Sequence, residues 1–242
     1  MNRILILDNS IDHGVYQPLE HWKPLLLFPF DSFRVSAGEM PGSLDPYSHV
    51  IVTGSEASVL GDLDWILAEE ELLRLAVGMG KVILGSCFGH QMIARSLFGK
   101  ETVRRMKEPE IGWSRIRIIR GDSLVGRAGQ YVHTFLLHFD EVCGLPKQEA
   151  TVLARSARCR VQAFKLRQRP VWGIQAHPEI GIVEGLRLLG SLLENDEHRR
   201  RYLARAERSC PRDSGWIVPL MRAFQQSQSS AKVSESDPPV EG

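Results

Sequence analysis

Residues 81–91 read KVILGSCFGHQ, and this stretch decides the fold. Residues 82–84 are a short apolar run, which is typical of a buried strand. Residues 90–97 continue as a helical pattern that ends near Gly99. The two patterns meet within residues 85–89, so we expect a sharp strand-to-helix turn there.

The chain on the N-terminal side of this stretch shows the same alternation. Residues 3–8 and 49–53 are apolar or β-branched strand candidates, and residues 33–36 are a weaker one. Residues 65–77 interleave leucines with glutamates, which predicts an amphipathic helix. Strands that alternate with helices predict a parallel sheet with helices packed against it.

The following eighty or so residues have a different pattern, because no helix of any length separates their strand candidates. We expect these strands to pair antiparallel at one side of the sheet. They are residues 113–119, 131–137, 150–154, 160–166 and 171–175, after which a helix is expected over 184–193.

The domain organisation follows from the C-terminal part of the chain. We expect one α/β domain over residues 1–195 and a C-terminal helical extension, residues 196–225, packed on it. The extension has helical patterns over 196–208 and 216–224. Residues 226–242 contain almost no apolar side chains, which predicts a disordered tail. Five arginines in the first helical pattern favour a solvent-exposed face over a binding patch: Arg199, Arg200, Arg201, Arg205 and Arg208.

The composition excludes several classes of function. Lys and Arg total 30 against 29 for Asp and Glu, so the net charge of +1 favours neither nucleic acid nor a membrane as partner. No apolar run approaches the roughly 18–20 residues that span a bilayer, and we see no signal peptide, so we expect a cytoplasmic protein with reduced cysteines. The four cysteines lack CxxC or zinc-finger spacing, so no metal site is expected: Cys87, Cys143, Cys159 and Cys210.

Cys87 lies at the centre of the expected turn, in a Gly-x-Cys-x-Gly sequence. This is the thiol form of a nucleophile elbow, in which a tight turn lifts the nucleophile above the edge of the sheet. The helix that follows directs its N-terminal N–H groups at the sulfur, and the N–H of Phe88 faces an oxyanion formed beside it. Cys87 is therefore the candidate nucleophile, and the alternative is a buried structural cysteine.

A cysteine nucleophile needs a base, and His177 is the leading candidate among eight histidines. It follows the strand candidate at 171–175, and catalytic groups of α/β sheets gather at the carboxyl ends of strands. Glu179 can accept a hydrogen bond from the other ring nitrogen and so orient the ring. The alternative is a histidine that caps a loop.

A second backbone donor is expected at Gly54 and Ser55, which follow the strand candidate at 49–53. A glycine-containing loop at the carboxyl end of a strand can direct an N–H group at the same oxyanion. An ordinary strand-ending turn explains these two residues equally well.

The two segments together resemble the class I (triad) glutamine amidotransferases. That family combines a G-x-C-x-G-x-Q turn with a Q-x-H-P-E segment, found here at residues 85–91 and 175–179. The resemblance implies a triad of Cys87, His177 and Glu179. It also implies an α/β fold, a flavodoxin-like open sheet that is mostly parallel with an antiparallel side and has helices on both faces.

The resemblance also implies the substrate-binding residues. Gln91 matches the family glutamine that contacts the amino-acid end of the substrate, and His138, Phe139 and Asp140 resemble the other wall of that site. Many members have Gly-Gly-Pro where this chain has Gly54, Ser55 and Glu56, which leaves the oxyanion N–H available but changes its surroundings.

The expected function is that of a glutamine amidotransferase-like hydrolase. It would cleave the γ-carboxamide of glutamine through a γ-glutamyl thioester and release ammonia, without a cofactor, to a separate acceptor or synthase subunit. One alternative is a γ-glutamyl peptidase that acts on glutathione-like substrates. Another is a catalytically silent binding or regulatory module on the same scaffold.

Overall fold

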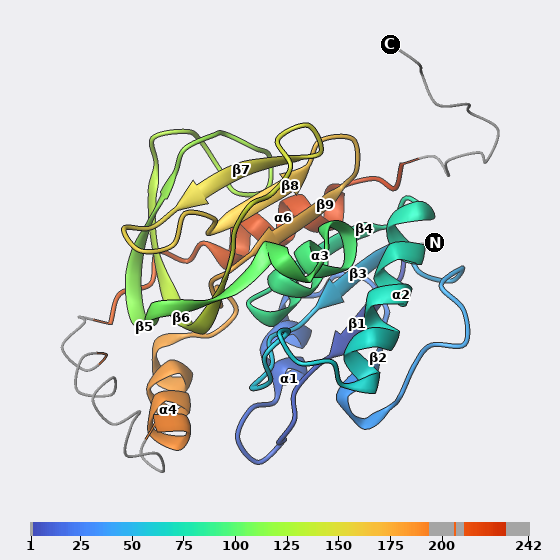
Figure 1. Cartoon of the computed structure of the whole chain (residues 1–242), viewed down its shortest axis with the longest axis horizontal. Helices are drawn as coiled ribbons and strands as arrows, with labels where there is room; N and C mark the ends of the chain where they lie inside the picture. Colours follow the sequence, from blue (N-terminus) through green and yellow to red (C-terminus); the bar gives the residue numbers. More distant parts are fainter. Residues whose placement is uncertain (1, 194–205, 207–210, 231–242) are drawn as a thin grey trace.

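The computed structural model describes residues 2–193, 206 and 211–230. One nine-stranded sheet runs through it, with helices on both faces (Figure 1). The strands are β1 Ile4–Asp8, β2 Phe30–Arg34, β3 His49–Val52, β4 Val82–Ser86, β5 Val103–Ile118, β6 Tyr131–Val142, β7 Ala150–Arg155, β8 Ala163–Leu166 and β9 Val171–Ile174. The helices are α1 Pro18–Trp22, α2 Asp64–Gly78, α3 Phe88–Phe98, α4 Ile182–Leu193 and α6 Ile217–Gln226, and the short 3-10 helices are Lys23–Leu25, Val35–Ala37 and Lys100–Thr102.

The sheet has a parallel half and an antiparallel half. Its order is β2-β1-β3-β4-β9-β8-β7-β5-β6. The first five strands are parallel to one another, and every pairing from β9 to β6 is antiparallel. These pairings confirm the expected α/β fold, with its parallel sheet and antiparallel side. The sheet as a whole curls into a half-barrel.

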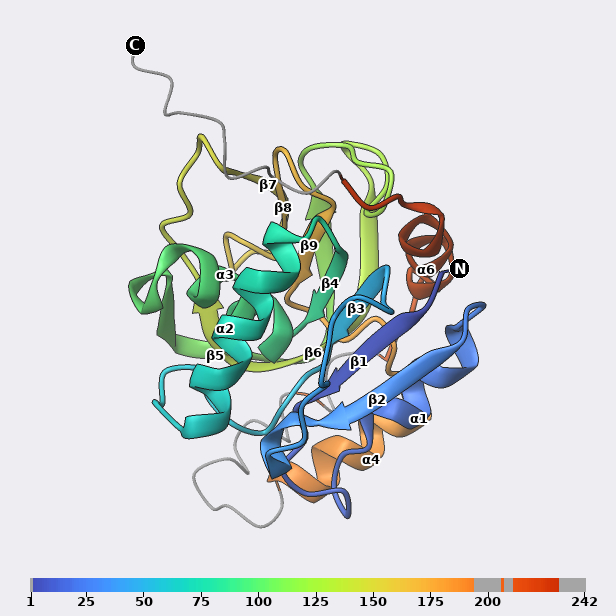
Figure 2. The same cartoon turned by 90° about the vertical axis from the view of Figure 1, so that its right-hand side faces the viewer.

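Helices cover both faces of the parallel half, which explains why its strands are apolar throughout. The side chains of Leu5 and Leu7 on β1 face the cluster formed with α2 and α3. Ile4 and Ile6, on the opposite face, pack in the cluster that contains Trp22 of α1 and the apolar side of α6. Figure 2 shows α2 and α3 on one side of these strands and α1, α4 and α6 on the other.

Several of the predicted strands differ from the structure, and three of the differences affect how the sheet is built. The predicted strand at 33–36 is instead β2, which ends at Arg34 because residues 35–37 form a 3-10 turn capped by Gly38 at φ 83°. The predicted strand at 113–119 is only part of β5, whose first half contains charged residues and a register shift between Arg105 and Glu110. Strand β9 is antiparallel to β8, as predicted, but parallel to β4, so it joins the two halves.

The C-terminal part of the chain is described only in pieces. The helix predicted over 196–208, with its arginines, lies outside the described residues except for the buried Ala206. Helix α6 places Leu220 and Phe224 against the sheet. Beyond it, the N–H of Ser230 donates to the carbonyl oxygen of Gly80 at 3.0 Å, and residues 231–242 again lie outside the described part. Each helix in the described ranges is too short or too polar to cross a bilayer.

Candidate active site

The turn between β4 and α3 holds Cys87 in a strained conformation. Its φ of 51° is the only positive value at a non-glycine position among the described residues. A residue in this region of φ/ψ space costs roughly 1–3 kcal/mol and persists only where the surroundings impose it. The N–H of Cys87 donates to the carbonyl oxygen of Ile174 on the neighbouring β9 at 2.9 Å, which fixes the turn against the sheet.

Two glycines allow α3 to lie directly on the strands. A Cβ atom on Gly89 would lie 2.2 Å from the carbonyl oxygen of Val52 on β3, and one on Gly85 would lie 2.4 Å from the carbonyl oxygen of Gly89. Both distances are far below contact, and the obstructing atoms belong to the backbone. The predicted strand-to-helix turn is therefore present, and the glycines on either side of Cys87 are what permit it.

His177 lies just past the end of β9, in a bridge to β6. Its N–H donates to the carbonyl oxygen of Phe135 at 2.9 Å. Its Nδ1 lies 2.8 Å from Oε1 of Glu179, whose side chain is completely buried. Burial alone would lower the pKa of His177, but the negative charges of Cys87 and Glu179 outweigh it and raise the pKa to about 10. The imidazole is therefore held in its protonated form beside the sulfur.

Two hydroxyl groups hold the carboxylate of Glu179. Ser86 Oγ donates to it from 3.2 Å, and the hydroxyl of Tyr16 lies 3.4 Å from Oε1. Tyr16 is buried, and its ring meets the ring of His177 edge-on at a centroid distance of 6.0 Å. Burial, followed by the charge of Glu179, raises the pKa of Tyr16 well above its ordinary value, so the hydroxyl keeps its proton.

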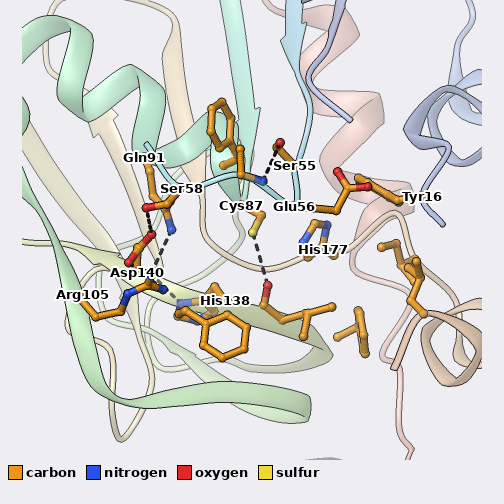
Figure 3. A pocket seen from close by; sticks show the side chains of 17 residues that line it. Tyr16, Ser55, Glu56, Ser58, Cys87, Gln91, Arg105, His138, Asp140 and His177 are labelled. Atoms are coloured by element: carbon orange, nitrogen blue, oxygen red, sulfur yellow. Dashed lines mark hydrogen bonds and ion pairs between the residues drawn. The ribbon is translucent and has the colours of Figure 1, made fainter. Parts of the chain in front are cut away.

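Cys87 and His177 open into a cleft (Figure 3). The cleft lies at the carboxyl ends of β3, β4 and β9, where α/β sheets collect their ligands. Its walls include the predicted residues Ser55, Phe88, Gln91, His138, Phe139 and Asp140.

Two predicted residues lie behind the cleft wall. Glu179 does not line the cleft, and its carboxylate contacts His177, Tyr16 and Ser86 instead. Gly54 supports the imidazole, since a Cβ atom there would lie 2.5 Å from Cε1 of His177. The backbone near the sulfur is as expected: Phe88 is the first residue of α3, where N–H groups have no acceptor within the helix.

A polar network joins α3 to β6 at one end of the cleft. Gln91 Nε2 donates to the carbonyl oxygen of Asp140 at 2.9 Å, and His138 Nδ1 lies at the same distance from that oxygen. The carboxylate of Asp140 accepts a hydrogen bond from Ser58 Oγ at 2.6 Å and pairs with Arg105 Nη1 at 3.2 Å. The four residues expected from the family resemblance therefore lie together.

Sequence reasoning missed Tyr16, Ser58 and Arg105, which also line the cleft. Each lies in a segment without a recognisable motif, and only long-range pairing brings it to the site. Glu56, which stands where many family members have proline, also lines the cleft, and its role was not predicted. Its carboxylate accepts hydrogen bonds from the N–H groups of Ile11 and Asp12 at 2.9 and 3.2 Å, and so fastens the Tyr16 loop to the Gly54 loop.

The described residues contain no group of three or more His, Cys, Asp or Glu side chains arranged to hold a metal ion. Cys143 and Cys159, the other cysteines that the structure describes, are free thiols outside the cleft. Burial raises the pKa of both.

Comparisons with known proteins identify the family of the chain. The glutamine amidotransferase class-I family model matches residues 39–186, more than half of the chain. Gamma-glutamyl peptidase 4 of Arabidopsis thaliana is 36% identical over 157 residues, which are 62% of this chain and 61% of that protein. A second relative, from Thermoplasma acidophilum, is named as one of the subunits of a glutamine-hydrolysing GMP synthase. It is 28% identical over 177 residues, covering 70% of this chain and 82% of that protein.

The fold has close counterparts among solved structures. A glutamine amidotransferase from Thermotoga maritima superposes with a TM-score of 0.74 at 22% identity, covering 93% of this chain and 99% of that one. The aligned part spans only about three fifths of the length of the Arabidopsis peptidases.

Proposed function

The chain belongs to the class I glutamine amidotransferase family, and we propose that it hydrolyses γ-glutamyl amides through a thioester on Cys87. One observation carries the proposal. A cysteine held at positive φ at the start of a helix lies beside an imidazole, and that imidazole is oriented by a buried carboxylate 2.8 Å away. A cysteine beside an oriented imidazole that can take its proton is the arrangement that cysteine nucleophiles require.

The first half of the reaction transfers the γ-glutamyl group to sulfur. The thiolate of Cys87 attacks the γ-carbonyl carbon, so a C–S bond forms and the carbonyl electrons move to the oxygen. The N–H of Phe88 and the backbone of Gly54 and Ser55 stabilise that oxyanion. When the intermediate collapses, the C–N bond breaks, and His177 gives its proton to the leaving nitrogen, which departs as ammonia or an amine.

The second half regenerates the thiol. Water attacks the γ-glutamyl thioester while the now neutral His177 takes one of its protons. The C–S bond breaks, glutamate leaves, and the thiolate–imidazolium pair is restored. Glu179 accepts a hydrogen bond from the ring throughout, so it orients the base and stabilises its charged form.

The polar network is proposed to bind the amino-acid end of the substrate. An α-amino acid presents one ammonium and one carboxylate group. The carboxylate of Asp140 complements the first and the guanidinium of Arg105 the second, and both line the cleft. Gln91 and His138 fix the backbone of Asp140, so they set the position of this wall.

Two substrates fit this chemistry. The first is glutamine, with ammonia passed to an acceptor enzyme on another chain. It is supported by the family and by the relative that is named as part of a glutamine-hydrolysing GMP synthase. The second is a γ-glutamyl peptide, favoured by the 36% identity to a protein named as a γ-glutamyl peptidase.

A substrate panel tests the proposal. The purified protein is incubated with glutamine, γ-glutamyl dipeptides and glutathione, and glutamate and ammonia are both measured. Glutamate with equal ammonia from glutamine supports the first substrate, and glutamate from the peptides supports the second. Cys87→Ser should abolish either activity, whereas Cys143→Ser, at a thiol outside the cleft, should not. A folded wild-type protein that releases no glutamate from any of them would favour the silent module.

A further inference from the structure

The two ends of the cleft differ in chemistry. One end is the polar network around Asp140. The other lies on the far side of Cys87, where Tyr16 and His177 are seen in Figure 3. That end is lined by Phe135, Ile180 and Leu188, which are all at most 2% exposed and belong, with Tyr16, to one buried apolar cluster.

Two of the apolar residues contact His177, the proposed catalytic base. The ring centroids of Phe135 and His177 are 6.3 Å apart. Ile180 follows His177 by three residues, and its N–H donates to the carbonyl oxygen of His177 at 3.2 Å. The side of the base that faces away from the polar network is therefore apolar.

The proposed mechanism fixes which part of the substrate lies at each end. The γ-carbonyl carbon must lie at Cys87 Sγ, and the amino-acid end extends toward Asp140. The leaving nitrogen must lie within hydrogen-bond reach of His177, which protonates it. Any substituent on that nitrogen consequently extends toward Ile180 and Leu188.

From this we infer that the His177 end of the cleft is a leaving-group subsite for an apolar, uncharged amine, so that the preferred substrates are γ-glutamyl amides of alkyl or aryl amines. The inference rests on the proposed function and adds the class of leaving group. Burial of apolar substituents against Phe135, Ile180 and Leu188 favours such amides over glutamine itself.

The charge at this end disfavours a leaving amine with a carboxylate next to the nitrogen, so γ-glutamyl peptides should be cleaved less efficiently than uncharged amides. The carboxylate of Glu56 lines the cleft and lies beside Tyr16 at this end (Figure 3). Its oxygens are held by the N–H groups of Ile11 and Asp12. A carboxylate on the leaving amine would meet this fixed like charge, whereas a neutral alkyl group would not.

The test uses a series that varies only the leaving amine. The kcat/KM of the wild-type protein is measured for glutamine and for the γ-glutamyl amides of methylamine, isoamylamine and leucine. Because one methylene in an apolar pocket changes kcat/KM by roughly tenfold or more, the isoamylamide should exceed the methylamide by at least about tenfold. The leucine compound has the isoamyl skeleton plus a carboxylate, and it should be a poorer substrate than the isoamylamide.

Neighbouring leucines on α4 provide a matched pair of variants. Leu188 lines the cleft, whereas Leu189 is equally buried and does not. Leu188→Ala should lower the isoamylamide-to-methylamide ratio by about fivefold or more, and Leu189→Ala should leave the ratio within about twofold. If Leu188→Ala does not fold, Ile180→Val removes a single methylene from the same surface and should lower the ratio less.

The outcomes separate this inference from the proposed function. The proposed function would stand but the apolar subsite would be overturned by either of two results. The first is cleavage of glutamine and the methylamide with an isoamylamide-to-methylamide ratio of kcat/KM near one. The second is an equal change of that ratio in the two leucine variants. A leucine compound as good as the isoamylamide would overturn the preference for an uncharged leaving amine. If the protein cleaves none of the compounds in the series, the proposed function is contradicted, and the leaving-group assignment with it.

Discussion

The parallel and antiparallel halves of the sheet contribute different things to one cleft. The parallel half supplies Cys87 and His177 from the ends of β4 and β9, which are adjacent strands in register at Ser86 and Ile174. The antiparallel half supplies Arg105 from β5 and residues 137–140 from β6. In the first half, positions are set by the backbone, through a strained turn and close glycines. In the antiparallel half, the positions of the cleft residues are set by side chains that meet across neighbouring strands.

In the proposed function, the parallel half carries out the chemistry and the antiparallel half recognises the substrate. The reacting groups depend on backbone geometry that tolerates no added atoms. The substrate wall depends on a polar network between side chains, which can be altered while the strands remain paired. Substitutions near the reacting groups of the parallel half should therefore affect folding or kcat. Substitutions among the cleft residues of the antiparallel half should affect KM.

The largest effect is expected at Gly89. Gly89→Val would place a branched side chain against the carbonyl oxygen of Val52, so we expect a loss of several kcal/mol of unfolding free energy, or no folded protein. Gly78→Val is the control, because a Cβ at Gly78, in α2, meets nothing within 4 Å. Urea unfolding of both variants measures the difference. Similar midpoints for the two would mean that α3 does not lie on β3 as described.

The second largest effect is expected on KM, from a substitution of Asp140 in the antiparallel half. Asp140→Asn keeps the shape of the side chain and removes its charge, so KM for glutamine or a γ-glutamyl amide should rise about tenfold or more, with a smaller change in kcat. Glu141→Gln is the matched control on the same strand, since Glu141 pairs with Arg104 and does not line the cleft. A fall in kcat at unchanged KM would place Asp140 in the chemistry instead.

Buried carboxylates give a third contrast. In the antiparallel half, Glu110 accepts hydrogen bonds from several groups, whereas Glu69 of α2, beneath the parallel half, has one donor, Asn9 Nδ2 at 2.9 Å. Burial raises the pKa of Glu69 to about 8, above its ordinary 4.5. The folded state then holds a proton that the unfolded chain has lost, so stability should fall as pH rises between these values.

Glu69→Gln tests that sign. The glutamine amide has no charge to bury and can hydrogen-bond to both polar atoms of the Asn9 side chain. The variant should therefore lack the fall in unfolding free energy of roughly 1 kcal/mol per pH unit, and it should be more stable than the wild type near pH 8. Glu70→Gln, at the adjacent carboxylate, removes an ion pair with Arg95 and should destabilise instead. Parallel pH profiles for wild type and Glu69→Gln would show that Glu69 is not a buried neutral acid.

The smallest effect is expected at Tyr16. Tyr16→Phe removes one of two hydroxyl groups that hold Glu179, and Ser86 remains, so kcat should fall only about twofold to fivefold with KM unchanged. Tyr47→Phe is the control, because that buried tyrosine bonds Asp31 at 2.9 Å away from the cleft. A change in KM alone would indicate that Tyr16 contacts the substrate rather than the triad.

The same division explains what the sequence could predict. The turn at Cys87 and the segment at His177 are local, because a few consecutive residues determine each backbone path. Their meeting was predictable from the rule that parallel strands end at one edge. The fold class and the antiparallel side followed from the presence or absence of helices between strand candidates.

The remainder of the site could not be predicted from local pattern. Arg105 reaches Asp140 because β5, a strand of 16 residues, pairs with β6 and shifts register just after Arg105. Tyr16 reaches Glu179 across 163 residues of sequence. Neither contact leaves a periodicity or motif, since a single residue placed by a distant strand or loop carries no local signal.

In the proposed mechanism His177 and Cys87 act as one charged pair, and the pH dependence of alkylation at Cys87 shows whether they do. Alkylation by iodoacetamide is followed at that thiol by peptide mapping, with buried Cys159 as an unreactive reference. Wild-type protein should react readily near pH 6, where a free thiol of pKa about 8.5 is under roughly 1% ionised. His177→Ala should move the profile to higher pH, and Glu179→Gln should move it less. An unchanged profile in folded His177→Ala would contradict the claim.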